Sequence, residues 1–427
     1  MNASSIPAAR PWRRARHVIL VASLVNLAGV VHAESLSFND ALALALRDAP
    51  ALTANESQLD AARQAAIPAG TLPDPTLTLG VDNLPVEGPD RYSLTRDFMT
   101  MRKIGVMQEF PNRARRDARV AAARGRVELA KAETRITRLT VLRETAVAWI
   151  ARDSVEQQLA RIDALFDENR LLDAAVRARL AGGQGTATET VMPRQEAAMI
   201  DERRDELRAR REQAIANLRR WIGTAAEAPL AGTSPDWPIS HETLTHGLHR
   251  HPEIAAFASK AQVLEAEVAE ARAAKLPDWA LELAYQQRGS QFGDMVSLQV
   301  SFDLPLFAGL RQDPQIAAKL AERTGLDAER ETMVREHAAE LEADLAEHQR
   351  LANAVRRQRE VLLPLAGEKV ALALAAWRGG NGSLTELIAA RRERIDAGLK
   401  TISLDGERRQ LAARLHYAYG NDTGEQP

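Results

Sequence analysis

Residues 180–189 read LAGGQGTATE, and residues 378–386 read RGGNGSLTE. In each stretch a pair of glycines is followed by a third glycine, then by a hydroxyl residue and a glutamate. Aligning the two stretches also pairs residues further along the chain: Glu189 with Glu386, Arg194 with Arg391, and Gly223 with Gly420. Such ordered coincidences indicate a tandem repeat.

The repeat divides the chain into five expected segments. A signal peptide covers 1–33, and a first helix–strand–strand–helix repeat covers 34–223. A linker covers 224–241, a second repeat covers 242–420, and 421–427 form a disordered tail.

The signal peptide is expected from the order of charge and hydropathy at the start of the chain. Four arginines precede an apolar run, Val18–Val31, which ends in the cleavage-like pattern Val31-His32-Ala33. The run is short for a membrane span. A free N-terminal anchor helix is the alternative.

Both halves show one order of elements. A short amphipathic helix such as Phe38–Asp48 comes first, and a proline then starts a second helix, over 50–67 and 252–275. Two strands follow, because apolar residues alternate with small or polar ones, the pattern of a strand with one apolar face. These strands lie near 77–81 and 104–110, and then over 279–286 and 295–302.

Two long helices complete each half. The stretch 112–181 contains no proline, and a continuous helix of this length would reach roughly 100 Å. Its partner, 315–378, is interrupted by Pro364. A glycine-rich turn then reverses each helix, and the returning helices end at Trp221 and Tyr419. Soluble helices average about 11–12 residues, so these are expected to pack as coiled coils.

The strands have the length that crosses a bilayer when tilted. A sheet in a bilayer must close, and four strands per chain are too few because the smallest membrane barrels have about eight. The predicted fold is therefore mainly α with a small membrane β-barrel. Two copies would give eight strands, whose interior is filled by side chains, whereas three copies give twelve strands, which can leave a lumen. We therefore expect long coiled-coil helices that form an α-barrel, and four β-strands per chain that contribute to a twelve-stranded trimeric barrel.

Composition excludes several classes of protein. The chain has 427 residues, no cysteine and a formal net charge of −2. Balanced charge argues against a nucleic-acid partner, and the absence of cysteine excludes disulfides and thiolate metal sites. No Ser-His-Asp order or carboxylate pair stands out, and the glycine turns lack the lysine of a phosphate loop. We therefore expect neither an enzyme nor a cofactor.

The sequence resembles the TolC family of outer-membrane efflux channels. The resemblance covers nearly the whole chain after the signal peptide: the repeat, the strand pairs, the prolines between helices and strands, and the Gly-x-Gly turns with their acidic residues. The long leader and the LPDP sequence at 72–75 resemble the CzcC/CusC-like branch, which serves heavy-metal efflux. The lipobox cysteine of some relatives is missing, so no lipid anchor is expected.

The resemblance implies a homotrimer in the outer membrane of a Gram-negative cell, with a long periplasmic extension. It implies two partners, a periplasmic adaptor (membrane-fusion) protein and an inner-membrane pump of the resistance-nodulation-division type. The implied function is a passive exit duct for heavy-metal cations. The alternatives are a multidrug duct of the same family, a periplasmic coiled-coil adaptor or scaffold, and a secreted metallohydrolase.

The resemblance also assigns roles at the hairpin tips. Gly182, Gly183, Gly379 and Gly380 allow the left-handed backbone of a tight reversal. In the family, acidic residues after the turn, with a nearby aromatic and basic residue, line or latch the periplasmic aperture. The matching positions here are Glu189, Glu386, Trp377 and Arg179. The alternative for the two glutamates is stabilisation of a helix N-terminus.

Two sets of residues are weak candidates for metal contact. Met99, Met101 and Met107 offer thioethers suited to Cu(I), although methionine also fills gaps in packing. His246 and His249 lie three residues apart in a histidine-rich stretch, 241–251. The alternative for them is an exposed helix start.

Overall fold

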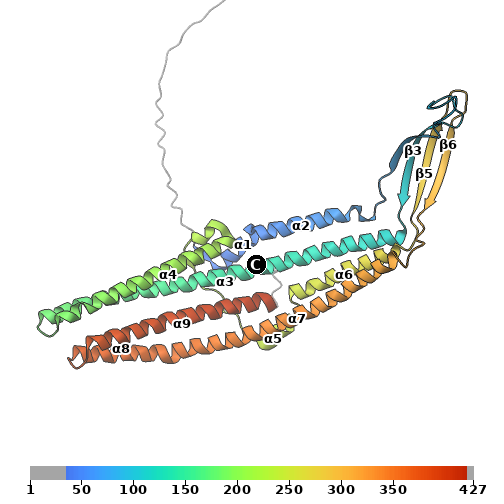
Figure 1. Cartoon of the computed structure of the whole chain (residues 1–427). Coiled ribbons are helices and arrows are strands. Elements are labelled where there is room, and N and C mark those ends of the chain that lie inside the picture. The colour runs from blue at the N-terminus through green and yellow to red at the C-terminus, as the bar shows by residue number, and fades with distance from the viewer. Residues whose placement is uncertain (1–34, 421–427) are drawn as a thin grey trace, which may run out of the picture. The chain divides into compact units, whose positions relative to one another are not determined.

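The computed structural model describes residues 35–420. The expected signal peptide and the expected tail fall outside these residues. The described chain is mainly helical, with one four-stranded antiparallel sheet and one short parallel strand pair (Figure 1). This confirms the predicted class, mainly α with a small β part. Within the described residues, no helix is both long and apolar enough to cross a membrane.

The first half contains two short helices, two strands and two long helices. Their bounds are α1 Phe38–Asp48, α2 Pro50–Ala66, β2 Thr76–Asp82, β3 Met101–Phe110, α3 Arg113–Ala181 and α4 Met192–Ile222. The second half repeats this order, but a π-helical turn, η4 (Gln358–Leu362), divides its longest helix. Its bounds are α5 His241–Leu248, α6 Pro252–Ala273, β5 Trp279–Gln287, β6 Met295–Phe302, α7 Gln312–Arg357, α8 Leu363–Arg378 and α9 Leu384–Tyr419.

Short elements connect these pieces. Three are 3₁₀ turns: η1 Pro68–Gly70, η2 Ala187–Thr190 and η3 Gly223–Glu227. The strands β1 (Leu36–Ser37) and β4 (Leu230–Ala231) pair in parallel, so part of the expected linker is bound to the start of the described chain.

The π-helical turn lies just before Pro364. Proline has no backbone N–H and its ring clashes with the preceding turn, so a helix must widen, kink or break there. The chain widens over Gln358–Leu362 and continues as α8. The interruption predicted at this proline is therefore confirmed as a local change of helix type.

The junction between helix and strand is fixed by Asp278. Its Oδ1 accepts hydrogen bonds from the backbone N–H of Asn112 at 2.7 Å and from the Asn112 side chain at 2.8 Å. Its Oδ2 lies 2.6 Å from Nη1 of Arg115. Asn112 in turn caps α3, because its Oδ1 accepts from the N–H of Arg115. The start of α3 and the start of β5 are thereby held together.

α3 is the central helix and packs against α2, α4, α6 and α9 (Figure 1). Trp149 at its middle is fully buried, and its ring meets that of Phe38 edge-on at 5.5 Å. The buried Arg152 donates from Nη1 to the carbonyl of Ala226 at 2.6 Å, which fixes η3 against the helix. A core of small and aliphatic side chains from α1, α3 and α4 surrounds these residues.

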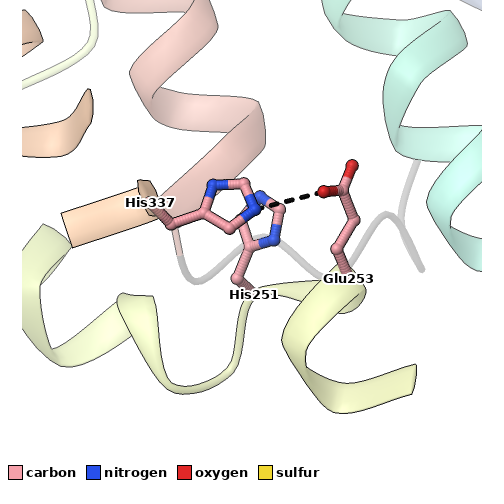
Figure 2. A group of neighbouring side chains, drawn as sticks. All are labelled: His251, Glu253 and His337. Carbon is pink, nitrogen blue, oxygen red and sulfur yellow. Dashed lines mark hydrogen bonds and ion pairs between the residues drawn. The ribbon is translucent and has the colours of Figure 1, made fainter. Parts of the chain in front are cut away.

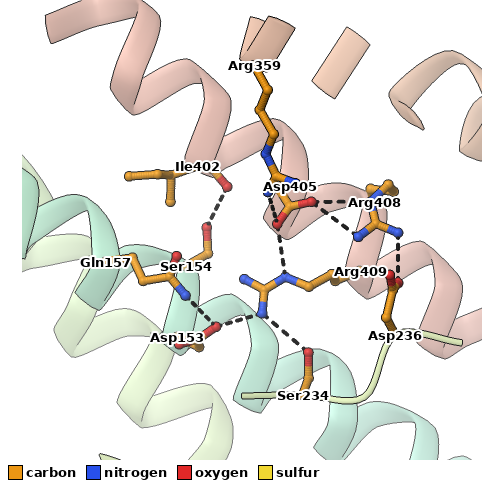
Figure 3. Close-up of polar contacts among 10 residues, drawn as sticks. All are labelled: Asp153, Ser154, Gln157, Ser234, Asp236, Arg359, Ile402, Asp405, Arg408 and Arg409. Carbon is orange, nitrogen blue, oxygen red and sulfur yellow. Dashed lines mark hydrogen bonds and ion pairs between the residues drawn. The ribbon is translucent and has the colours of Figure 1, made fainter. Parts of the chain in front are cut away.

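A polar network joins α3, the linker and α9 (Figure 3). Arg409 donates from Nη1 to Oδ2 of Asp153 at 2.7 Å and to Ser234 at 3.3 Å. Asp405 lies 3.0 Å from Nη2 of Arg359 and 3.2 Å from Arg408. These contacts tie α9 to α3 and to the linker, and Arg359 of η4 joins the network through Asp405.

Candidate functional site

The two helical hairpins turn through paired glycines. The second glycine of each pair has a positive φ, 73° at Gly183 and 79° at Gly380. A residue with a side chain adopts this left-handed conformation only at a cost. Gly182 and Gly379, the first of each pair, have φ of −79° and −76°. Residues with side chains adopt such φ values readily, so the backbone conformation does not require glycine at these two positions.

Both turns close with the same hydrogen bond. The N–H of Gln184 donates to the carbonyl of Arg179 at 3.0 Å, and the N–H of Asn381 donates to that of Ala376 at 3.0 Å. This six-to-one bond marks the Schellman motif, which ends helices at a left-handed residue. The third glycine also matters, because a Cβ at Gly382 would lie 2.8 Å from the Ala376 Cβ. The recurrence of this third glycine in both turns, as Gly185 and Gly382, is the sequence signal of that role.

Each glutamate after a turn belongs to a capping box. Oε2 of Glu189 accepts from the N–H of Thr186 at 3.0 Å, and the Thr186 hydroxyl accepts from the N–H of Glu189. Oε2 of Glu386 accepts from the N–H of Ser383 at 3.3 Å, with the reciprocal bond at 3.2 Å. These bonds satisfy N–H groups that have no partner inside the helix. Within the chain, the two carboxylates therefore cap the N-terminal ends of η2 and α9.

Arg179 links the first hairpin to the second. Its Nη1 donates to the carbonyl of Trp377 at 2.5 Å, and its Nη2 donates to that of Gln184 at 3.2 Å. The guanidinium carbon lies 4.6 Å from the centroid of the Trp377 ring, within the range of a cation–π contact. Trp377 itself is 4% exposed, in a cluster with Leu172, Val176, Leu384, Leu387 and Ile388.

The structure thus brings Arg179 and Trp377 together, whereas Glu189 and Glu386 each bond within their own turn. The tips are two reversals of the same design, joined by the contacts of Arg179 with the carbonyl and the ring of Trp377 and by the apolar cluster around that ring.

The four-stranded sheet has one apolar face. Neighbours are antiparallel in the order β2-β3-β5-β6. Their register aligns residues in rows across the sheet: Leu77, Val106, Leu283 and Leu298 form one row, and Leu79, Ile104, Tyr285 and Val296 form the next. These side chains are 45–70% exposed. Rows of exposed aliphatic residues are unusual on a surface in water, and they mark an interaction site.

An aromatic row borders this face. Phe110, Trp279 and Phe302 align across β3, β5 and β6 at the end of the sheet next to the helices. The rings of Phe110 and Trp279 stack at 4.1 Å. Aromatic girdles flank the apolar band of membrane strands at the level of the headgroups.

The opposite face is polar. One row is Thr78, Gly105, Ala284 and Ser297, and another is Thr76, Met107, Glu282 and Gln299. Nζ of Lys103 lies 2.6 Å from Oε1 of Glu282 across the strands. An apolar face backed by a polar one is the alternation of a strand that separates lipid from water.

The sheet has two open edges. β2 and β6 each pair with one strand within the described chain, so each has a row of backbone groups facing outward. Such edges pair with other strands unless they are blocked. Both edges are therefore available for strands from another chain.

The structure separates two of the three candidate methionines. Met101 and Met107 lie on the polar face of β3, six residues apart and therefore about 20 Å apart. Met99 lies outside the strand. The sulfurs of Met101 and Met107 are too far apart to bind one ion.

The candidate histidines lie on the surface and not in a buried site. His246 and His249 are exposed at the end of α5, and the ring of His246 bonds the carbonyl of Glu242 at 2.7 Å. The structure joins His251 to His337, a residue of α7 for which no pattern in the sequence predicts a role. Their ring centroids lie 3.9 Å apart. Burial, together with the nearby His337, lowers the pKa of His251 to about 4, so its ring is neutral at neutral pH.

Comparison with solved structures defines the class of fold: it is shared by channel-forming proteins of the outer membrane. A membrane protein from Pseudomonas aeruginosa matches with a TM-score of 0.76 and 19% identity, over 90% of each chain. CusC, whose structures concern transmembrane channel formation, matches with a TM-score of 0.76 and 16% identity, over 90% of this chain and 92% of its own. The outer membrane protein VceC from Vibrio cholerae matches with a TM-score of 0.72 and 19% identity, over 90% and 96%. No protein-family model and no curated protein matches the sequence.

Proposed function

We propose that the chain is the outer-membrane channel component of a tripartite efflux system. Three copies join their sheets into one membrane barrel of twelve strands, and the long helices continue it through the periplasm as an α-barrel. The duct is passive, with no catalytic step and no cofactor. Each copy consists of two repeats, 34–223 and 242–420, joined by the linker 224–241.

The sheet is the observation that carries the proposal. An exposed apolar face suits lipid, the opposite polar face suits a water-filled lumen, and the aromatic row suits the interface. Four strands with two open edges are incomplete in a membrane, because unpaired backbone groups there cost several kcal/mol each. A ring of copies satisfies β2 and β6 together, and twelve strands leave room for a lumen.

The similar structures support this assignment. VceC is described as an outer membrane protein, and the CusC structures concern formation of a transmembrane channel. We extend both properties to this chain, together with export by the signal peptide and a homotrimeric state. The partners are a periplasmic adaptor and an inner-membrane resistance-nodulation-division pump, which supplies the energy.

We propose heavy-metal cations as the cargo. The support is the resemblance of the LPDP sequence at 72–75 and of the long leader to the CzcC/CusC-like branch. A strain that lacks this chain should then lose tolerance to metal salts while keeping its tolerance to organic drugs. The opposite result would assign the duct to multidrug efflux.

The hairpin tips form the periplasmic aperture in this proposal. Threefold symmetry repeats Glu189 and Glu386 around one axis, and the resulting carboxylate ring attracts cations. Arg179 and Trp377 hold the second hairpin against the first and so fix the width of the opening.

Disulfide trapping tests the assembly directly, because the native chain has no cysteine. One cysteine replaces Ser297 in β6, and a second replaces Thr76, Thr78 or Gly80 in β2, all on the polar face. Oxidation of outer membranes should give a ladder that stops at three chains in at least one pairing. Chains with a single cysteine are the control and should not pass two.

Cell fractionation distinguishes an outer-membrane duct from a periplasmic adaptor or scaffold. Trimers in the outer-membrane fraction support the duct. A ladder that stops at two contradicts the twelve-strand barrel. A soluble periplasmic monomer would identify the chain as a coiled-coil adaptor or scaffold.

A further inference from the structure

Three side chains meet where the start of α6 contacts α7 (Figure 2). His251 precedes α6, Glu253 lies in its first turn, and His337 comes from α7. One ligand atom from each lies within 4.8 Å of the others. Within residues 35–420, this is the one group of three such side chains close enough to hold a metal ion.

The geometry of the group suits a tetrahedral cation. Nε2 of His337 and Oε2 of Glu253 lie 3.1 Å apart. Bonds of about 2.0–2.1 Å to a tetrahedral ion separate two ligand atoms by about 3.3–3.4 Å. This pair is therefore already near the required separation, and His251 offers a ring nitrogen within 4.8 Å of ligand atoms of the other two residues.

His251 has an unused ligand atom. The residue is 6% exposed, and no described residue forms a hydrogen bond with its Nδ1. A buried polar atom without a partner costs about 1–3 kcal/mol, so it needs an explanation. A bound cation would provide one, because a neutral imidazole nitrogen is a good ligand for it.

The surroundings leave room for a further ligand and favour positive charge. A cavity of about 20 Å³, lined by His251 and Glu253, adjoins the group and can hold one water. Oε2 of Glu340 lies 3.7 Å from Nδ1 of His337. The negative charge of Asp344 contributes to a raised pKa of the adjoining Tyr419. Arg143 is the one Lys or Arg side chain that lines the cavity.

We propose that His251, Glu253 and His337 bind one divalent cation of the zinc type per chain. Two imidazoles and one carboxylate are a common protein ligand set for Zn²⁺, with water in the fourth position. The ion would fasten the start of α6 to α7, next to the end of α9, and so stiffen the place where the short helices meet the long ones. The site is structural, and it does not depend on what the duct transports.

Metal titration of the full-length mature protein, purified in detergent without a histidine tag, tests the site. We expect one equivalent of Zn²⁺ per chain and a rise in the unfolding temperature with Zn²⁺ concentration. Co²⁺ should produce the visible absorption of a four- or five-coordinate ion at the same stoichiometry. His337→Ala should lower the affinity by at least about tenfold.

Two further variants make the outcome decisive. Glu253→Gln keeps the shape of the side chain but removes its charge, so it should also lower the affinity without unfolding the protein. The double variant His246→Ala with His249→Ala removes exposed histidines outside the group and should bind as the native chain does. Binding below one equivalent, or equal binding after the Glu253 and His337 changes, overturns the proposal, as does a loss confined to the double variant.

Discussion

Gly380 and Gly379 are adjacent in the turn after α8 but differ in backbone conformation. A Cβ at Gly380 would meet nothing within 4 Å, so only its φ of 79° opposes a side chain. At Gly379 the φ is negative, and a Cβ would lie 3.4 Å from the carbonyl of Ala375. Alanine at Gly380 therefore tests backbone strain without steric contact, and alanine at Gly379 is the control without strain.

We therefore expect Gly380→Ala to destabilise the turn by about 1–2 kcal/mol, and Gly379→Ala to have little effect. Hydrogen exchange of peptides over 376–386 measures this local opening. Exchange should accelerate about 5–30-fold in the first variant relative to the second. Equal rates in both variants would show that the left-handed residue does not limit opening.

A second residue-scale effect concerns Glu196, whose side chain is 1% exposed and whose oxygens accept no hydrogen bond from described residues. Burial raises its pKa, and Arg391, with its Nε 3.9 Å away, opposes the rise only in part. Because the pKa of Glu196 is higher in the folded state than in the unfolded state, the folded state binds more protons at pH values between the two. The contribution to stability is thus present at low pH and is lost as pH rises through the folded pKa.

Glu196→Gln should remove this dependence. The unfolding temperature of the native chain should fall relative to that of the variant as pH rises from about 4 to 7. Thermal melts at a series of pH values, in one detergent and at one ionic strength, provide the measurement. Parallel curves for the two proteins would mean that Glu196 has the same pKa folded and unfolded.

At the scale of elements, α3 and α9 approach closely because both present small residues. A Cβ at Gly406 would collide with Oγ and Cβ of Ser154, whose hydroxyl donates to the carbonyl of Ile402 at 3.3 Å. At Gly398, on the same helix, the nearest atom to an added Cβ is Nε of Arg161 at 3.7 Å. The two glycines of α9 are thus a matched pair.

Gly406→Ala should destabilise the protein by about 1–3 kcal/mol, because the helices must separate or Ser154 must move. Gly398→Ala should stabilise α9 slightly, since alanine is favoured over glycine inside a helix by about 1 kcal/mol. Denaturant titration of both variants against the native chain checks the contrast. A Gly406→Ala protein as stable as the Gly398→Ala protein would refute the close approach.

The elements could be predicted well from sequence because their signals are local. The period-two strands and the proline-free stretch 112–181 depend only on neighbouring residues, and β2, β3, β5, β6 and α3 lie where these patterns put them. The group around His251 could not be predicted in the same way. It depends on how α6 lies against α7, and no spacing in the sequence relates His251 to His337.

The tips fall between these cases. The recurring glycines predict the turns, and of the four paired glycines the structure shows Gly183 and Gly380 in the left-handed conformation. The contact of Arg179 with Trp377 needed the packing of α3 against α8 and α9. The aperture role, the homotrimer and the heavy-metal branch stay predictions.

At the scale of the whole molecule, the two capping glutamates allow a test of the aperture without disturbing the turns. Glutamine can accept the same backbone hydrogen bonds, so Glu189→Gln with Glu386→Gln keeps both capping boxes. In bilayer recordings, block by divalent cations from the periplasmic side should weaken in this double variant. Unchanged block in a normally assembled protein would remove the carboxylates from the aperture and leave them only their capping role.

The contact between Arg179 and Trp377 has no counterpart in the other repeat. The alignment of Gly182 with Gly379 places Ala376 opposite Arg179 and Leu180 opposite Trp377. In the proposed trimer, six hairpins surround the axis with approximate sixfold symmetry, but only three of the six seams between them hold this contact. Widening of the aperture should therefore begin at the three hairpin interfaces that lack this contact. The two hairpins of each protomer should move outward together as one unit.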